Sequence, residues 1–244
     1  MASLAKATLS GWHDGVGLVG PGLHNWAAAQ PVLAGAADDR PRPVVVPSPV
    51  TLPPPERRRL GLAVKVALVV AREAITNAQL DAKHLVAVFS SSGADGDNCD
   101  AICQALASED RHISPTRFHN SVHNASAGYW GIASGAMTQA TVLCAYDGSF
   151  SARLLETLAQ VTVEGVGAVL VTYEAPHPQP LLTKRPLPAA FGLALARMPH
   201  QGSRSLARLR IALVEGPVYL VGFLASEQAS YITGQIISVN GGMI

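Results

Sequence analysis

Apolar residues recur at intervals of three and four positions between Glu56 and Ala78, in the segment ERRRLGLAVKVALVVAREAITNA. This spacing places them on one face of a helix and therefore predicts a helix over these residues. Pro55 stands directly before the segment, where the fixed φ angle of proline suits a first helical turn. The face is rich in alanine and valine, so we expect close packing in the core.

Short continuous apolar runs alternate with helical patterns further along the chain. Such runs predict strands covered on both faces of a sheet, because those strands need no alternation of apolar and polar residues. Strands are expected at 84–90, 138–145, 167–173 and 190–197, and further helices at 97–107, 126–137 and 150–161. The repeated strand–helix–strand units indicate a three-layer α/β fold with parallel strand pairing.

The first 55 residues lack this periodicity. Residues 15–20 read GVGLVG and match the G-x-G-x-x-G pattern of dinucleotide-binding proteins. That pattern needs a hydrophobic strand before it and a helix after it, whereas here LSGWHD precedes it and Pro21-Gly22 follows. We interpret it as a glycine-rich loop and expect no cofactor. Residues 31–55 hold many prolines and are predicted to form an extended, exposed segment.

Composition narrows the class of protein. The chain has 244 residues, of which 48% are hydrophobic and 14% charged, as in a globular domain with a substantial core. A formal net charge of +1 gives no electrostatic reason to expect nucleic acid or an anionic membrane surface as partner. The three cysteines are too few for a disulfide framework and suit a reducing, cytoplasmic compartment. The longest apolar run, residues 60–75, contains three charged residues, so no membrane span is expected.

The stretch from Ile113 to Gln160 is the candidate functional centre. It is rich in Asn, His, Ser, Gly and Ala and contains one adjacent aromatic pair, Tyr129 and Trp130. Small residues at this density let backbones approach closely, as they do at a tight strand-to-helix turn. The predicted strand 138–145 leads through Tyr-Asp-Gly-Ser into the helix that begins at Phe150.

Four segments of the chain resemble the N-terminal half of the ketoacyl synthase (thiolase-fold) family, and in particular its short members that act as chain-length-factor-like partners in aryl polyene and related pathways. They read PPPERRRLGLAVKVAL, HLVAVFSSSGADGDNCDAICQAL, ISPTRFHNSVHNASAGYWGIASG and SFSARLLETLAQ. The resemblance covers roughly residues 8 to 213 and implies a thiolase-like α/β/α fold. It divides the chain into a ketosynthase-like domain, 1–213, and a tail, 214–244.

In active members of that family, the strand-to-helix turn carries a nucleophilic cysteine in a pattern like T-A-C-x-x-G. Placing Gly148 on the motif glycine puts Ala145 at the nucleophile position and Cys144 one residue earlier. A step of one residue along a strand turns the side chain to the opposite face, so we expect Cys144 to point away from the pocket. The alternative register makes Cys144 the nucleophile. The family's two catalytic histidines lie in its C-terminal half, and no H-G-T motif occurs here.

The tail resembles a different family. Its sequence, FLASEQASYITGQIISVNGGMI, is similar to the end of a short-chain dehydrogenase/reductase of the ketoacyl-ACP reductase type. The Tyr-x-x-x-Lys pair of that family is missing, because Tyr231 is followed at this spacing by Gln235. A short helix and a strand at 235–239 are expected here, and NADPH-dependent reduction is the least favoured function.

Polar and aromatic residues in the central stretch allow more than one role. A catalytic role is open to His119, Asn120, His123 and Asn124, but hydrogen bonds to backbone at a subunit interface are the favoured interpretation. The bulk of Tyr129, Trp130 and Phe150 suits the wall of an acyl channel, and the aromatic pair suits a core or interface equally well.

Two further groups of residues are open to a functional reading. Cys99 and Cys103 are spaced for one helix face, yet two thiols alone are weak evidence for zinc. We expect them to be small buried residues and expect no metal site. Arginines 57, 58 and 59 suit an acidic carrier protein, although a solvated helix start explains them equally well.

The sequence therefore predicts a non-catalytic, chain-length-factor-like subunit. It would pair with an active ketosynthase as a heterodimer and shape the pocket for an acyl chain carried by acyl carrier protein, in polyene, polyketide or fatty acid biosynthesis. The alternative is a minimal acyltransferase that uses Cys144.

Overall fold

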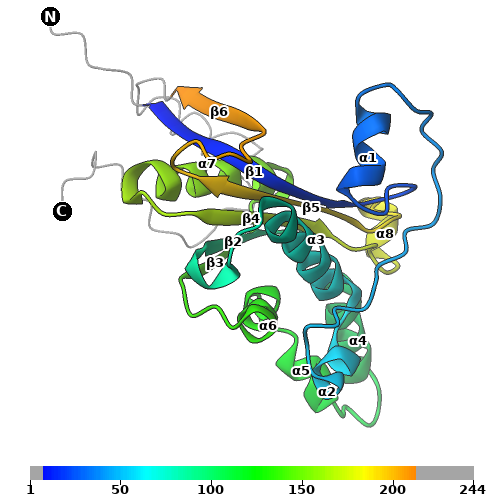
Figure 1. Ribbon diagram of the computed structural model, residues 1–244. Coiled ribbons are helices and arrows are strands. Elements are labelled where there is room, and N and C mark those ends of the chain that lie inside the picture. Colours follow the sequence, from blue (N-terminus) through cyan, green and yellow to red (C-terminus); the bar gives the residue numbers. More distant parts are fainter. Residues whose placement is uncertain (1–7, 213–244) are drawn as a thin grey trace, which may run out of the picture.

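The computed structural model describes residues 8–212, which form a six-stranded mixed sheet with helices on both faces (Figure 1). The strands lie in the order β3-β2-β4-β5-β1-β6. Their bounds are β1 Thr8–Val19, β2 Val86–Ser90, β3 Ala140–Leu143, β4 Ala168–Glu174, β5 Phe191–Met198 and β6 Ala207–Ala212. The layers agree with the predicted α/β fold.

The helices connect these strands and cover the sheet. They are α1 Trp26–Leu33, α2 Pro54–Arg59, α3 Leu62–Ala78, η1 Ala82–His84, α4 Gly96–Ala107, α5 Pro115–His119, α6 Ala125–Ser134, η2 Tyr146–Gly148, α7 Ser149–Ala159, η3 Gln160–Glu164 and α8 Leu181–Lys184. Helices α3 and α6 cover one face of the sheet, and α7 packs on β1, β2 and β4 from the other face. In Figure 1, α2, α4 and α5 gather beyond the end of α3.

Helix α3 is the centre of the core. Ten of its side chains are buried, and they form the alanine- and valine-rich face that the spacing predicts. A fully buried valine contributes about 2 kcal/mol relative to an exposed one, so this face stabilises the fold strongly. The helix ends at Gln79, which adopts a left-handed φ of 55° and donates its N–H to the carbonyl groups of Ile75 and Thr76.

Residues 15–19 belong to strand β1. The predicted glycine-rich loop at 15–20 is therefore wrong. Gly15 and Gly17 face α3, where an added Cβ would lie 2.1 Å from the Ala74 carbonyl oxygen and 2.0 Å from that of Val70, respectively. The glycines are therefore needed for close strand–helix packing rather than for a turn. The segment 31–55, predicted to be extended and exposed, is irregular and mostly exposed at 34–49, but α1 continues to Leu33 and α2 begins at Pro54, so the prediction was wrong at both ends.

Strand pairing is only partly parallel. Strand β2 pairs parallel with β3 and β4, whereas β4–β5, β5–β1 and β1–β6 are antiparallel. Parallel neighbours need a crossover connection. The proline-rich segment between β4 and β5 holds only the four-residue α8, so the chain returns antiparallel.

Several predicted boundaries differ from the observed ones. The predicted helix 56–78 is divided into α2 and α3 by Gly61, whose extended backbone (ψ 166°) precedes α3. A Cβ at Gly61 would lie 2.1 Å from a carboxylate oxygen of Asp95, which explains a glycine at the break. The predicted helix 126–137 ends at Gly135, which is left-handed with φ 66°. The reductase-like tail, 214–244, lies outside the described residues.

Candidate functional site

The turn between β3 and α7 is the structural centre of the predicted site. After Leu143 the chain passes through Cys144 and Ala145 into η2, and α7 begins at Ser149. Tyr146 has a left-handed φ of 50°, which is uncommon for a bulky side chain and marks a strained tip. Ala145, the predicted nucleophile position, immediately precedes this tip, and its N–H donates to Ser149 Oγ at 2.9 Å.

Arg185 occupies the space in front of this turn. Its Nη2 donates to Asp147 Oδ1 at 2.8 Å, and its guanidinium carbon lies 3.7 Å from the centre of the Tyr146 ring. The Arg185 side chain is only 18% exposed, whereas that of Asp147 is 78% exposed. Solvent therefore screens the ion pair, and the cation–π contact with Tyr146 is the better shielded of the two attractions. The tip thus presents an ion-paired carboxylate and a covered aromatic ring.

Cys144 lies beside this tip and contacts a histidine. Its Sγ is 3.8 Å from His123 Nδ1, so thiol and imidazole are close enough for a weak hydrogen bond. Burial of the sulfur raises the pKa of Cys144, and the Glu174 carboxylate raises it further. Because the thiolate is the nucleophilic form, this environment favours the unreactive thiol near neutral pH. Cys144 does not line the main cleft described below, whereas His123 does.

The predicted Asn and His residues separate into two groups. Asn120 is buried: its Nδ2 donates to the Arg59 carbonyl at 2.7 Å and its Oδ1 accepts from the Tyr129 hydroxyl at 3.0 Å. Asn120 therefore connects α5, α6 and the end of α2. In contrast, His119, His123 and Asn124 are exposed, and the His119 ring stacks edge-on against Tyr129.

The predicted aromatic residues also differ in burial. Tyr129 and Trp130 are 3% and 5% exposed and belong to the hydrophobic core. Phe150 is 37% exposed on α7. None of the three lines the main cleft, so the structure places the aromatic pair as core anchors.

A cleft of about 520 Å³ opens between α3, α4 and α5. Its volume lies in the range of small-ligand pockets, which are mostly apolar with a few polar groups. The lining includes Ala63, Val64, Ile102, Leu106, Ile113, Phe118 and Val122. The lining also includes Tyr173, which is 1% exposed and whose pKa is raised by burial to about 12. The hydroxyl therefore stays protonated at physiological pH.

Both cysteines of α4 line this cleft, and they are exposed rather than buried as predicted. The spacing does place Cys99 and Cys103 on one face, and burial, followed by the neighbouring Cys103, raises the pKa of Cys99. The apolar positions of α4 face the cleft instead of a continuous core, which leaves these thiols accessible. Within residues 8–212, no group of three or more His, Cys, Asp or Glu side chains is arranged to hold a metal ion.

Sequence reasoning missed two residues of the site. Arg185 lies in a proline-rich segment with no periodic pattern, and only the fold brings it to the turn. Tyr173 ends a predicted strand, and its position in the cleft follows from the pairing of β4 with β2. No helix in the described part of the chain is long and apolar enough to span a membrane.

Most of the chain matches one known protein family. Residues 24–215 match the model of the beta-ketoacyl synthase, N-terminal domain. The chain belongs to this family. The match contains the β3–α7 turn, the cleft and Arg185, so the site described above is part of a ketoacyl synthase N-terminal domain. No curated protein matches the chain.

Solved structures show the same fold. The chain is similar to one in the complex of a ketosynthase (ApeO) with its chain length factor (ApeC) from Xenorhabdus doucetiae, with 24% identity, a TM-score of 0.66, and coverage of 80% of this chain and 81% of that one. The ishigamide ketosynthase/chain length factor is 16% identical with a TM-score of 0.58, over 80% of this chain and 63% of that one. A complex of the type II polyketide ketosynthase AntDE with its acyl-carrier protein AntF gives 14% identity and a TM-score of 0.62, over 78% of this chain and 62% of that one. The thiolase-like fold is thus confirmed.

Proposed function

We propose that this protein is a non-catalytic, chain-length-factor-like subunit that pairs with an active ketosynthase. The observation that carries the proposal is the β3–α7 turn, whose tip is formed by Tyr146 and Asp147 and is held by Arg185. A ketosynthase turn must present a free nucleophile at this helix start. Here the tip offers no thiol, and the pKa of neighbouring Cys144 is raised.

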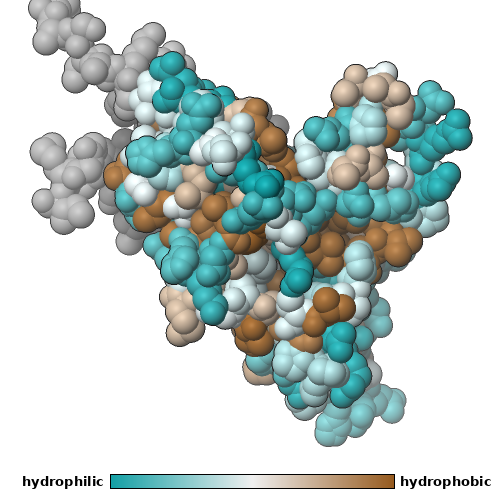
Figure 2. Space-filling model, in the orientation of Figure 1, coloured by the Kyte–Doolittle hydropathy of each residue, from teal (hydrophilic) through white to brown (hydrophobic). Residues whose placement is uncertain are grey.

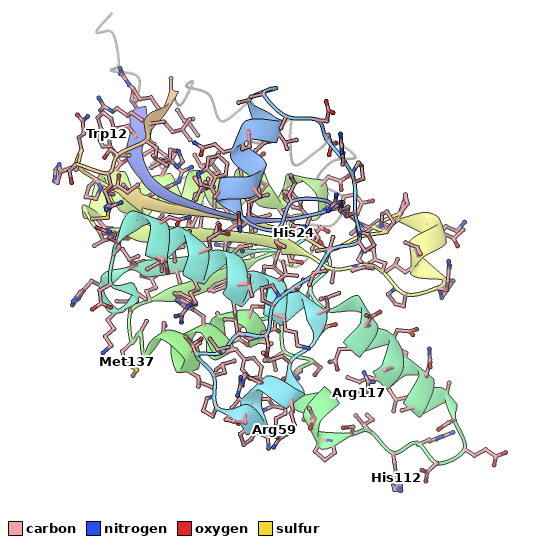
Figure 3. All side chains as sticks on the ribbon, turned by 45° about the vertical axis from the view of Figure 1, so that its right-hand side comes forward. Trp12, His24, Arg59, His112, Arg117 and Met137 are labelled. Atoms are coloured by element: carbon pink, nitrogen blue, oxygen red, sulfur yellow. The ribbon has the colours of Figure 1, made fainter. Side chains whose placement is uncertain are left out.

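Open surfaces on one side of the molecule support the pairing. Strand β3 is at the edge of the sheet, and an unpaired strand edge is a ready template for another chain. Large apolar side chains are exposed on nearby elements: Phe118 (68%), Val122 (52%), Ile132 (57%) and Met137 (96%). Figure 2 shows hydrophobic surface over α5 and α6, and Figure 3 shows Met137 extending from the loop after α6.

The cleft supports the second part of the proposal, a role in shaping an acyl pocket. Its walls are apolar, which suits a hydrocarbon or polyene chain. Helix α2, at the end of the molecule where Figure 3 shows Arg59, carries Arg57, Arg58 and Arg59 against one acidic residue, Glu56. Its net positive charge would attract an acidic acyl carrier protein. The active partner would supply the cysteine and histidines for condensation.

Co-expression with the cognate ketosynthase, followed by size-exclusion chromatography, tests the pairing. We expect one peak with both chains in equal amounts and condensing activity only in that peak. A folded chain that elutes alone in the presence of the ketosynthase would overturn the proposal.

The Cys144–His123 contact favours a second candidate, a minimal acyltransferase. Incubation of the isolated chain with an acyl-carrier thioester, followed by intact-mass measurement, separates the two. The pairing proposal predicts no acyl adduct. An adduct that disappears in Cys144→Ala but persists in Cys99→Ala would establish the acyltransferase instead.

A further inference from the structure

Four side-chain oxygens at the carboxyl ends of β2 and β4 are buried and have no hydrogen-bond partner among the described residues. They are Ser90 Oγ, Ser92 Oγ, Thr172 Oγ1 and Glu174 Oε2. A buried polar atom without a partner costs about 1–3 kcal/mol, and more when it carries charge. Four such atoms so close in the fold point to a ligand that satisfies them together.

The strand register brings these residues together. Ser90 is the direct partner of Thr172, and Glu174 lies two residues further along β4 on the same face. The backbone N–H of Ser92 donates to Glu174 Oε1, which fixes Ser92 beside that carboxylate. Strand spacing of about 4.8 Å and a same-face repeat of about 6.6 Å place the Cβ atoms of Ser90, Thr172 and Glu174 within about 8 Å of one another.

The four oxygens are buried although Ser92, Thr172 and Glu174 are each partly exposed as residues, and one side of the group is apolar. The preceding row on the same face is the apolar pair Val88 and Leu170, which are 0% and 1% exposed. Among the described residues, no Lys, Arg or His side chain forms an ion pair with Glu174. The buried Arg153 donates to Thr141 on β3. Strand β3 is separated from β4 by β2, so this hydrogen bond does not involve Glu174.

His177, which follows β4, is the other titratable group to consider here. It is 5% exposed and packs against Gly93. Neither of its ring nitrogens has a partner among the described residues. Glu174 therefore keeps an uncompensated carboxylate oxygen next to three hydroxyl groups.

We propose that Ser90, Ser92, Thr172 and Glu174 bind a dehydrated alkali-metal cation, Na⁺ or K⁺. Oxygen donors suit hard cations. One carboxylate neutralises one unit of charge, so a divalent ion would leave a buried excess charge, whereas a monovalent ion is balanced. The ion would tie the ends of β2 and β4 together beside the β3–α7 turn. This inference does not depend on the proposed function.

Thermal unfolding of the full chain at constant ionic strength tests the site, with choline chloride replaced stepwise by NaCl or KCl. We expect a saturable rise in Tm of about 3 °C or more for the preferred ion, since a ligand that binds only the native state stabilises it. Glu174→Gln keeps an acceptor for the Ser92 N–H but removes the charge, and should abolish the rise. Glu109→Gln, at an exposed glutamate on the surface, should retain it.

A second readout covers the case in which Glu174→Gln folds poorly. Titration of the unaltered chain into NaCl should broaden the ²³Na NMR signal, and the broadening should be lost in Thr172→Val. Equal Tm values in choline, Na⁺ and K⁺ with no ²³Na broadening would overturn the proposal and assign the four oxygens to ordered water. The same conclusion would follow if Glu174→Gln kept the full ion dependence.

Discussion

Gly17 shows how a single residue governs the packing of the core. Its position on β1 brings the strand against the backbone of α3, where a Cβ would overlap the Val70 carbonyl oxygen. Neither atom is at the end of a flexible side chain, so the strand and helix themselves must separate to admit a methyl group.

Gly17→Ala should therefore destabilise the protein by about 3 kcal/mol, the upper part of the range for overpacking. Urea unfolding followed by circular dichroism measures this loss. Gly128→Ala is the matched control, because a Cβ there meets nothing within 4 Å. It lies in α6, where alanine should be neutral or stabilising by about 0.5 kcal/mol. Equal effects of the two substitutions would contradict the packing argument.

His13 and Arg197 are paired neighbours on β1 and β5. Burial, followed by the positive charge of Arg197, lowers the pKa of His13 to about 4. Arg197 is itself fully buried, and burial lowers its pKa to about 10. The native state thus holds His13 neutral under conditions in which an unfolded chain would protonate it.

The free energy of unfolding should fall as the pH drops from 6.5 toward 4, because His13 becomes protonated in the unfolded chain while it stays neutral in the native state. Partial solvent exposure limits the loss at pH 5 to about 1–2 kcal/mol. Unfolding free energies at pH 7.5 and pH 5 measure it. His13→Gln should remove most of the difference, whereas His24→Gln, at an exposed position, should not. An unchanged pH dependence in His13→Gln would refute this assignment.

At the scale of elements, Asn120 joins α5 and α6 to α2. Neither α2 nor α5 has a buried residue. Apolar packing therefore contributes little to holding these two helices in place. Two hydrogen bonds of one amide therefore carry much of the connection.

Asn120→Ala should cost about 2 kcal/mol, because it leaves the Tyr129 hydroxyl and the Arg59 carbonyl without partners. Asn124→Ala is the control: Asn124 precedes α6 but its side chain makes no capping hydrogen bond. We expect less than about 0.5 kcal/mol there. Chemical denaturation of both variants measures the difference, and a similar cost for each would show that Asn120 has no special role.

Some elements could be predicted from local patterns in the sequence. Helix α3 was predicted correctly from its 3.6-residue periodicity, and strands β2, β4 and β5 were predicted correctly from their apolar runs. Strand β1 was missed because its glycines mimic a loop, and β6 because its burial pattern alternates weakly over ARLRIA. Both strands exist through pairing with distant parts of the chain, which no local pattern encodes.

On the molecule as a whole, exposed apolar side chains are found on elements far apart, among them α6 and α1. Ile132 on α6 is 57% exposed near the β3 edge, and Leu33 on α1 is 62% exposed at the other end of the sheet. Figure 1 shows these two helices far apart. If the partner docks on the side of β3, only one of them belongs to the interface.

Ile132→Lys should weaken the complex with the ketosynthase at least about tenfold, since burying an unpaired charge at an interface costs 1.4 kcal/mol or more. Leu33→Lys adds the same charge at similar exposure and should leave binding within about twofold. Affinity measured by biolayer interferometry with both variants decides this. Equal weakening by both would place the interface elsewhere.

The α/β class, the packed helix α3 and the family could be predicted from the residues alone, because these depend on local periodicity and on residue identities along the chain. The surroundings of the β3–α7 turn follow from the folded chain. The arginine that holds the turn, the thiols of α4 in the cleft and the oxygens at the ends of β2 and β4 come from segments far apart in the chain. Their chemistry arises from proximity and burial, which are properties of the folded chain.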